Sequence, residues 1–86
     1  MLDIELSNYA KKFLRKYDKN LCIRILDKIK ELSNNPFPQD TKRVVGRKEK
    51  TFRIRVGGYR ITYIVFMSKK IIVIADIDKR GRVYKR

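Results

Sequence analysis

Histidine is absent from this 86-residue sequence, and cysteine occurs once, at position 22. Without histidine the chain cannot build a His-based zinc site, a Ser-His-Asp triad, a Cys-His pair or a histidine general base. A single cysteine excludes an intrachain disulfide, which favours an intracellular protein, here expected to be cytoplasmic. Because Cys22 falls in an apolar stripe at helical spacing, we interpret it as a small core residue and not as a reactive thiol.

Long apolar runs are missing as well. The longest, Tyr63–Met67 and Ile71–Ala75, are far shorter than the roughly 20 residues that cross a bilayer. Met1–Leu6 has neither the basic start nor the apolar stretch of a signal peptide. Glycine-rich phosphate loops are absent too, because Gly57-Gly58 lies between two predicted strands and opens no helix. Because the apolar runs are so short, we expect no membrane association. With no cluster of carboxylates, histidines or cysteines to hold a metal, we expect no cofactor.

Acidic residues are scarce relative to basic ones. The chain has 23 Lys and Arg against 9 Asp and Glu, a formal net charge of +14. Such an excess implies an anionic partner, which is nucleic acid or an acidic protein once a membrane is set aside. Since 43% of the residues are hydrophobic, the chain has enough apolar side chains for one small core. We therefore expect residues 1–86 to form a single domain.

The N-terminal half shows first the period of a strand and then that of helices. Met1–Leu6 alternates apolar and acidic residues, and Ser7 is placed to cap a first helix. Asp18 is placed to cap a second helix, which Pro36 stops because proline cannot continue the hydrogen bonding. A short strand is expected at Lys42–Val45, in the connector that follows.

Residues Thr51–Asp78 are the centre of the predicted domain and read as an antiparallel meander of three strands. In the first strand, apolar residues at 52, 54 and 56 alternate with Arg53 and Arg55. Gly57-Gly58 then forms a tight turn, since two glycines can supply a positive φ twice, as a two-residue hairpin loop demands. A second turn is expected at Ser68-Lys69.

The Gly57-Gly58 turn fixes which residues of the hairpin oppose each other. Arg55 faces Arg60, and Arg53 lies one step further along the same face of the sheet. Like charges in such positions repel, so a structural sheet gains nothing from them and replacing Arg60 should barely affect folding. A bound anion with several phosphates would relieve the repulsion, because arginine's planar fork matches phosphate oxygens. The alternative is a solvated, charged face without a ligand.

Three runs carry a resemblance to a known family: FRIRV at 52–56, GYRITY at 58–63 and IDKRGRVY at 77–84. In this spacing the sequence resembles the RelE/ParE family of toxins from type II toxin–antitoxin systems, over essentially the whole chain. The resemblance implies an α+β fold in which an N-terminal strand and a two-helix hairpin accompany a small, twisted, mainly antiparallel sheet. It also implies neutralisation by a cognate acidic antitoxin.

The C-terminal tyrosine favours the RelE-like branch, whose members are mRNA interferases. The resemblance then implies a metal-independent, ribosome-dependent endoribonuclease that cleaves mRNA in the A site by 2′-hydroxyl attack on the phosphodiester and so inhibits translation. By position, the catalytic residues carried over are Arg53, Arg55, Arg60, Arg80 and Tyr84. The residues expected to contact RNA around them are Lys48, Lys50, Lys79 and Arg82.

The sequence departs from that family in two respects. The turn between Arg55 and Tyr59 is one residue shorter than in typical members. The strand also carries arginines where a lysine would help to take up the proton, and arginine is a poor base but a good stabiliser of a dianionic phosphorane. Either Lys79 or Lys50 could supply the lysine, with a proton affinity lowered by neighbouring cations.

Two other functions fit the same residues. The first is a ParE-like inhibitor of DNA gyrase that performs no chemistry, which the missing strand lysine favours. The second is a basic nucleic-acid-binding module without enzymatic activity. On local grounds alone two roles of Tyr84 stay equally open, because its ring can pack on the sheet or stack on a base.

Overall fold

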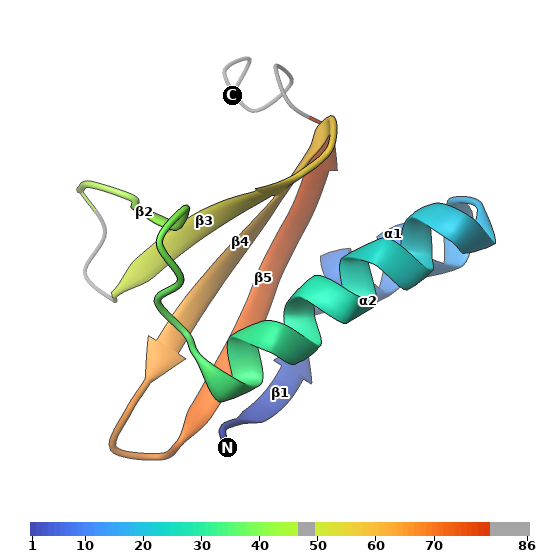
Figure 1. The fold of residues 1–86 in the computed structure, drawn as a ribbon. Coiled ribbons are helices and arrows are strands. Elements are labelled where there is room, and N and C mark those ends of the chain that lie inside the picture. Colours follow the sequence, from blue (N-terminus) through green and yellow to red (C-terminus); the bar gives the residue numbers. More distant parts are fainter. Residues whose placement is uncertain (47–49, 80–86) are drawn as a thin grey trace.

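The computed structural model describes residues 1–46 and 50–79 of the chain. These residues form two helices and a five-stranded sheet with the order β1-β5-β4-β3-β2 (Figure 1). Strand β1 pairs with β5 in parallel, and the other neighbouring strands are antiparallel. The α+β architecture predicted from the sequence is therefore confirmed. The elements in chain order are β1 (Asp3–Leu6), α1 (Asn8–Lys16), α2 (Lys19–Asn34), β2 (Lys42–Arg43), β3 (Thr51–Val56), β4 (Tyr59–Phe66) and β5 (Ile71–Lys79).

Both helices begin at the residues that the sequence marks as caps. The Ser7 hydroxyl accepts a hydrogen bond from the backbone N–H of Ala10 at 3.1 Å, and the Asp18 carboxylate accepts one from Leu21 at 2.9 Å. Each bond satisfies an N–H that has no partner within the helix. The second helix ends at Asn34, just before the proline that was expected to stop it.

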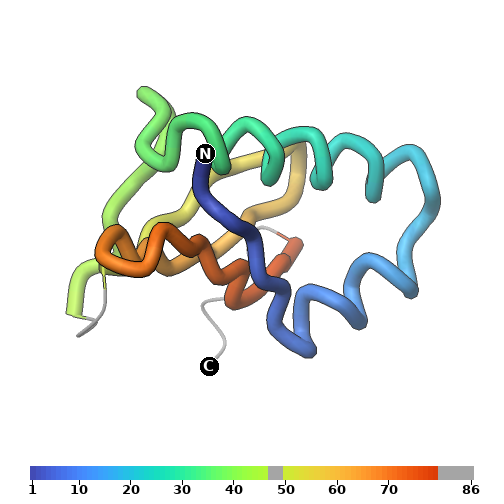
Figure 2. Tube along the Cα trace, turned by 90° about the horizontal axis from the view of Figure 1, so that it is seen from below, coloured from blue at the N-terminus to red at the C-terminus, as the bar shows by residue number. Residues whose placement is uncertain are grey.

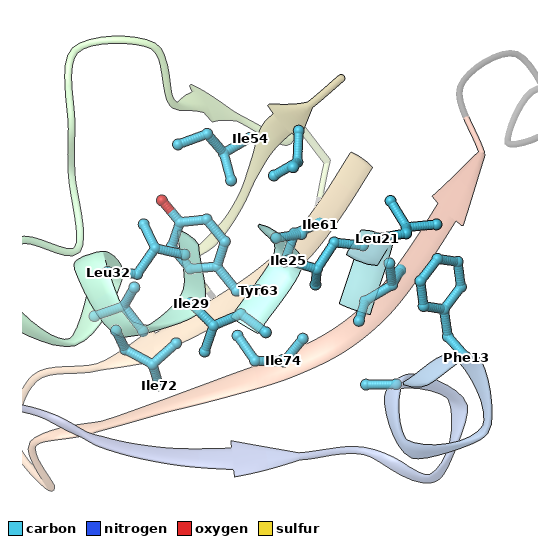
Figure 3. Close-up of a cluster of buried hydrophobic side chains, with 14 residues drawn as sticks. Phe13, Leu21, Ile25, Ile29, Leu32, Ile54, Ile61, Tyr63, Ile72 and Ile74 are labelled. Carbon is cyan, nitrogen blue, oxygen red and sulfur yellow. The ribbon is translucent and has the colours of Figure 1, made fainter. Parts of the chain in front are cut away.

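The two helices pack on the same face of the sheet. Figure 2 shows α2 lying along one side of the strands while α1 diverges from it, and α1 packs mainly against β5. Their apolar stripes meet the inward residues of β3, β4 and β5 in one buried cluster (Figure 3), which includes Phe13, Ile25, Ile29, Leu32, Ile54, Ile61, Tyr63, Ile72 and Ile74. The other face of the sheet is left without a helix in the described part of the chain.

The β3–β4 hairpin has the register predicted from its turn. Arg55 pairs with Arg60, and Ile54 pairs with Ile61. The turn itself differs from the expectation, because Gly57 has a positive φ of 59° while Gly58 does not lie in the left-handed region. A type II′ turn needs a positive φ only at its first central residue, so the second glycine is not required by the backbone.

The second turn is longer than expected. Strand β4 ends at Phe66, and the turn occupies Met67–Lys70, with Lys70 in the left-handed region at φ 55°. The short strand in the connector likewise comprises Lys42–Arg43 and not the four residues predicted.

A bulge in β5 changes which side chains face the core. At the β4 end near the turn, Phe66 pairs with Ile71 and Tyr63 with Ile74, but the register shifts between Thr62 and Tyr63. Without that shift Asp76 would oppose Ile61 in the core. The extra residue instead lets Ile77 oppose Ile61, and it moves Asp76 and Asp78 to the face away from the helices.

The connector is fastened to the sheet by a buried tyrosine. The Tyr63 hydroxyl donates to the carbonyl of Pro36 at 2.7 Å and accepts from the Thr41 hydroxyl. The carbonyl oxygen of Arg53, 3.3 Å from the Thr41 hydroxyl, is an alternative acceptor for the same proton. These bonds bring β2 alongside β3 and hold it there.

Neither helix in the described part of the chain is long and apolar enough to cross a membrane.

Candidate functional site

Three predicted site residues share the sheet face that the helices leave uncovered. Residues directly opposite each other in an antiparallel pair point to the same side of the sheet, as do residues two apart on one strand. The register Arg55–Arg60, together with the spacing of Arg53 and Arg55, therefore places Arg53, Arg55 and Arg60 on one side. We call this side, from β2 to β5, the arginine face.

The three arginines differ in their exposure. Arg55 is exposed and Arg53 is partly buried, whereas Arg60 is only 5% exposed. Arg60 lies on β4, which has β3 on one side and β5 on the other. Burying a guanidinium group is costly unless a counter-charge compensates it, so the residues on both sides of Arg60 matter.

Asp78 of β5 lies directly opposite Arg60 in the β4–β5 ladder. Arg60 thus has a cation, Arg55, on one side and a carboxylate on the other. The expectation that this face carries only mutually repelling arginines is incomplete, because it considered the β3–β4 hairpin alone. The β5 bulge, which decides that Asp78 and not Ile77 faces Arg60, has no clear signal in the sequence.

Lys42 is a site residue that the sequence prediction did not select. It is exposed, and it pairs with Arg53 in the β2–β3 ladder, so it belongs to the arginine face. The only sequence signal was its membership of a basic stretch in the connector. Its place beside Arg53 depends on the pairing of β2 with β3, which the alternation of residues does not reveal.

Lys50 and Lys79, the two lysines considered as proton acceptors, lie elsewhere. Lys79 pairs with Tyr59, whose ring packs against Phe13 and Tyr17 from the helical side. Lys50 is exposed and precedes β3, and alternation along the chain gives it the same side as Phe52, which packs against the core. The register therefore directs both lysines away from the arginine face.

The remaining predicted residues cannot be placed. Lys48, Arg80, Arg82 and Tyr84 lie outside the described residues.

A further cation approaches the site from the helical side. The guanidinium group of Arg24, on α2, lies over the β3–β4 turn, and a Cβ at Gly57 would be 2.7 Å from its Nη2. Arg24 thus adds positive charge at the tip of the hairpin, next to the strand end that carries Arg55. No periodicity in the sequence links Arg24 to this turn.

The described part of the arginine face combines groups suited to a phosphodiester. Guanidinium groups can hold phosphate oxygens bidentately and stabilise charge that develops on them. Asp78 adds a carboxylate on the same side, directly opposite Arg60, whereas Asp76 lies opposite Thr62, away from the three arginines. The arrangement can therefore bind an anion through cations while offering a carboxylate as a proton acceptor.

Comparison with known families and sequences gives consistent results. A family model described as the ParE toxin of type II toxin–antitoxin systems matches residues 4–84. The chain is also 30% identical over 86 residues to a protein of Methanocaldococcus jannaschii that carries the name toxin RelE1. That match covers 96% of this chain and 94% of the relative.

Solved structures with the same fold come from complexes and from isolated proteins. The RelE–RelB complex of Pyrococcus horikoshii OT3 contains a chain that matches with a TM-score of 0.82 and 27% identity, covering 94% of this chain and 97% of that one. The RelB–RelE complex of Methanococcus jannaschii matches with a TM-score of 0.72 and 26% identity, over 93% and 94%. The isolated E. coli RelE toxin matches with a TM-score of 0.79 over 99% and 93%, but at 22% identity this supports the fold alone.

Proposed function

This chain belongs to the RelE/ParE family of toxins from type II toxin–antitoxin systems, and from that premise we propose that it is a ribosome-dependent endoribonuclease. It cuts mRNA in the A site of cytoplasmic ribosomes and so inhibits translation. The observation that carries the proposal is the arginine face, where three guanidinium groups share a sheet surface that neither described helix covers. The net charge of +14 adds attraction to RNA over a longer range.

In this mechanism the arginines act by position and charge. The ribose 2′-hydroxyl attacks the adjacent phosphorus, and the negative charge on the phosphoryl oxygens increases as the phosphorane forms. Arg55 and Arg60 hold and neutralise these oxygens, and Arg53 supports them from the same strand face. Arg80 assists the departing 5′-oxygen and Tyr84 stacks on or orients the nucleotide, roles that rest on the family resemblance alone.

We expect the reaction to need the ribosome because the protein alone does not hold both reacting groups, the 2′-hydroxyl and the phosphorus, in place. Positioning two reacting groups can account for much of a barrier, and arginine contacts to one phosphate leave the rest of a flexible RNA weakly constrained. We expect the ribosome to align the 2′-hydroxyl with the phosphorus. Free RNA should therefore be cut far more slowly than message in the A site.

The test compares message cleavage on programmed ribosomes with cleavage of the same RNA free in solution. Arg55→Ala should lose about 100-fold in rate, while Arg15→Ala, an exposed arginine on α1, should keep the wild-type rate. Equal rates on free and ribosome-bound RNA would contradict the ribosome dependence. Absence of cleavage in both would contradict the enzymatic proposal.

A second candidate is a ParE-like inhibitor of DNA gyrase that performs no chemistry. It is favoured by the name of the matching family model and by arginines in place of lysine on β3. A supercoiling assay with purified gyrase separates the two. Inhibition of gyrase without any RNA cleavage would support this candidate and exclude the first.

We also infer that an acidic antitoxin neutralises the protein. Two of the similar toxins were solved together with their RelB partners, and a chain of +14 favours an acidic partner. Carboxylates of such a partner would cover the arginine face in place of phosphates. If they do, adding salt should weaken the complex markedly, whereas an affinity that salt leaves unchanged would indicate that apolar burial dominates.

A further inference from the structure

We propose that Asp78 is the general base that takes the proton from the ribose 2′-hydroxyl. This inference rests on the proposed endoribonuclease function and names a catalytic residue for it. Neither the arginines nor the two lysines considered from the sequence fill that role, so the base was the missing part of the site.

The first argument is the position of Asp78 relative to the phosphate site. Arg55, Arg60 and Asp78 occupy directly opposite positions on β3, β4 and β5. Neighbouring strands lie about 4.8 Å apart, so a phosphate held by Arg55 and Arg60 has Asp78 on its β5 side. The 2′-hydroxyl that attacks this phosphorus belongs to the directly preceding ribose, which places it within reach of a side chain one strand away.

The second argument is the elimination of other proton acceptors among the described residues. The register puts Lys50 and Lys79 on the helical side of the sheet. Lys42 shares the arginine face but lies beside Arg53, and an ordinary lysine is protonated at neutral pH. A carboxylate is ionised there and is a common general base.

Asp76 is the nearest competitor and serves as the matched control. It pairs with Thr62, two residues further along β5 and about 6.6 Å from the position of Asp78. Both aspartates lie on the arginine face and both are partly buried. Only Asp78 is opposite an arginine that the proposed mechanism uses.

The step balances without any further reagent. The Asp78 carboxylate accepts the proton of the 2′-hydroxyl while the O2′–P bond forms. The P–O5′ bond then breaks, and the 5′-oxygen takes up a proton from water. The products are a 2′,3′-cyclic phosphate and a 5′-hydroxyl end, and Asp78 returns its proton to solvent.

The surroundings of Asp78 on the sheet are charged. Arg60 faces it from β4, Arg55 lies one strand beyond on β3, and Asp76 is on its own strand. A carboxylate is ionised at neutral pH, so a rate that depends on a carboxylate base should level off before neutrality.

The experiment measures single-turnover cleavage on programmed ribosomes for the wild type, Asp78→Asn, Asp78→Glu and Asp76→Asn. Asp78→Asn should lose about 100- to 1,000-fold in rate, Asp78→Glu should recover part of this loss, and Asp76→Asn should stay within a few-fold of wild type. Binding of message with a 2′-deoxy nucleotide at the cut site, which cannot react, should persist in Asp78→Asn. That combination separates a base from a residue that merely holds Arg60 in place.

Several results would overturn the inference. Asp78→Asn cleavage within ten-fold of wild type would exclude Asp78 as the base, and a parallel loss of 2′-deoxy message binding would assign it to positioning. If Asp78→Asn does not fold, the wild-type pH profile decides: a rate that climbs steadily from pH 6 to 9 excludes a carboxylate base. A wild type that cleaves no message would refute the proposed function itself. An active wild type together with an equally active Asp78→Asn would refute only the assignment of Asp78 as the base.

Discussion

Arg60 lies directly opposite Asp78 in the β4–β5 ladder, and it is only 5% exposed. This relationship changes what Arg60 does for the fold. Considered within its hairpin, Arg60 only repels Arg55, and its loss should not matter for stability. Opposite a carboxylate and largely buried, it is also in position to compensate a negative charge on the same sheet face.

Arg60→Ala should therefore reduce both activity and stability. We expect a loss of about 100-fold in message cleavage, because one charged contact to the transition state is removed. We also expect a loss of about 1–3 kcal/mol in the free energy of unfolding, since Asp78 is left without its cross-strand cation. Cleavage on programmed ribosomes and urea unfolding measure the two effects, and unchanged stability would show that Arg60 and Asp78 do not interact.

Lys42 should contribute to RNA binding without contributing to the chemical step. Lys42→Ala should weaken binding of a non-cleavable RNA and reduce the slope of log affinity against log salt by about 0.7, the loss of one phosphate contact on a single strand. Lys69→Ala is the control, since Lys69 is an exposed lysine in the β4–β5 turn. Equal changes in the two variants would show that only net charge matters.

The part of the site that was predicted correctly from the sequence lies in the β3–β4 hairpin. The alternation around Arg53 and Arg55 and the Gly57-Gly58 turn act over fewer than ten residues, and they sufficed to place Arg55 opposite Arg60. The helix caps at Ser7 and Asp18 are equally local signals, and both were confirmed.

The parts that were missed depend on contacts that are distant in sequence. Asp78 faces Arg60 only because the register shifts between Thr62 and Tyr63, and the residues there carry no glycine that would announce a bulge. The Ser7 hydroxyl, 68 positions away in sequence, donates to the carbonyl of Ala75 at that bulge. Alternation within one strand cannot report such a contact.

The two turn glycines should respond differently to substitution. Gly57→Ala forces a side chain into the left-handed region, at φ 59°, and against the guanidinium of Arg24. Since Arg24 is flexible and can move, the cost should come mainly from backbone strain and amount to about 1–2 kcal/mol. Gly58→Ala meets no atom within 4 Å and should change stability by less than about 0.5 kcal/mol. Thermal melts of both variants test this, and equal destabilisation would contradict the turn geometry.

Tyr63 supplies the last prediction, which concerns the bonds between the connector and the sheet. Tyr63→Phe removes the hydroxyl that donates to the Pro36 carbonyl and accepts from Thr41, so the Pro36 oxygen loses this donor and the Thr41 hydroxyl loses this acceptor. We expect a loss of about 1–2 kcal/mol in the free energy of unfolding at neutral pH. Tyr9→Phe, at a tyrosine that is 73% exposed, should have no effect.

The same tyrosine should make stability depend on pH in the alkaline range. Burial raises the pKa of the Tyr63 phenol above its ordinary value of 10.0, and the Thr41 hydrogen bond only partly opposes this. Above about pH 10 the unfolded chain releases this proton while the folded protein keeps it, so the folded state binds more protons and stability falls as pH rises. Urea unfolding of wild type and Tyr63→Phe between pH 8 and 10.5 measures the effect. The gap between the two proteins should narrow above pH 10, and a constant gap would show that Tyr63 titrates no differently in the folded and unfolded states.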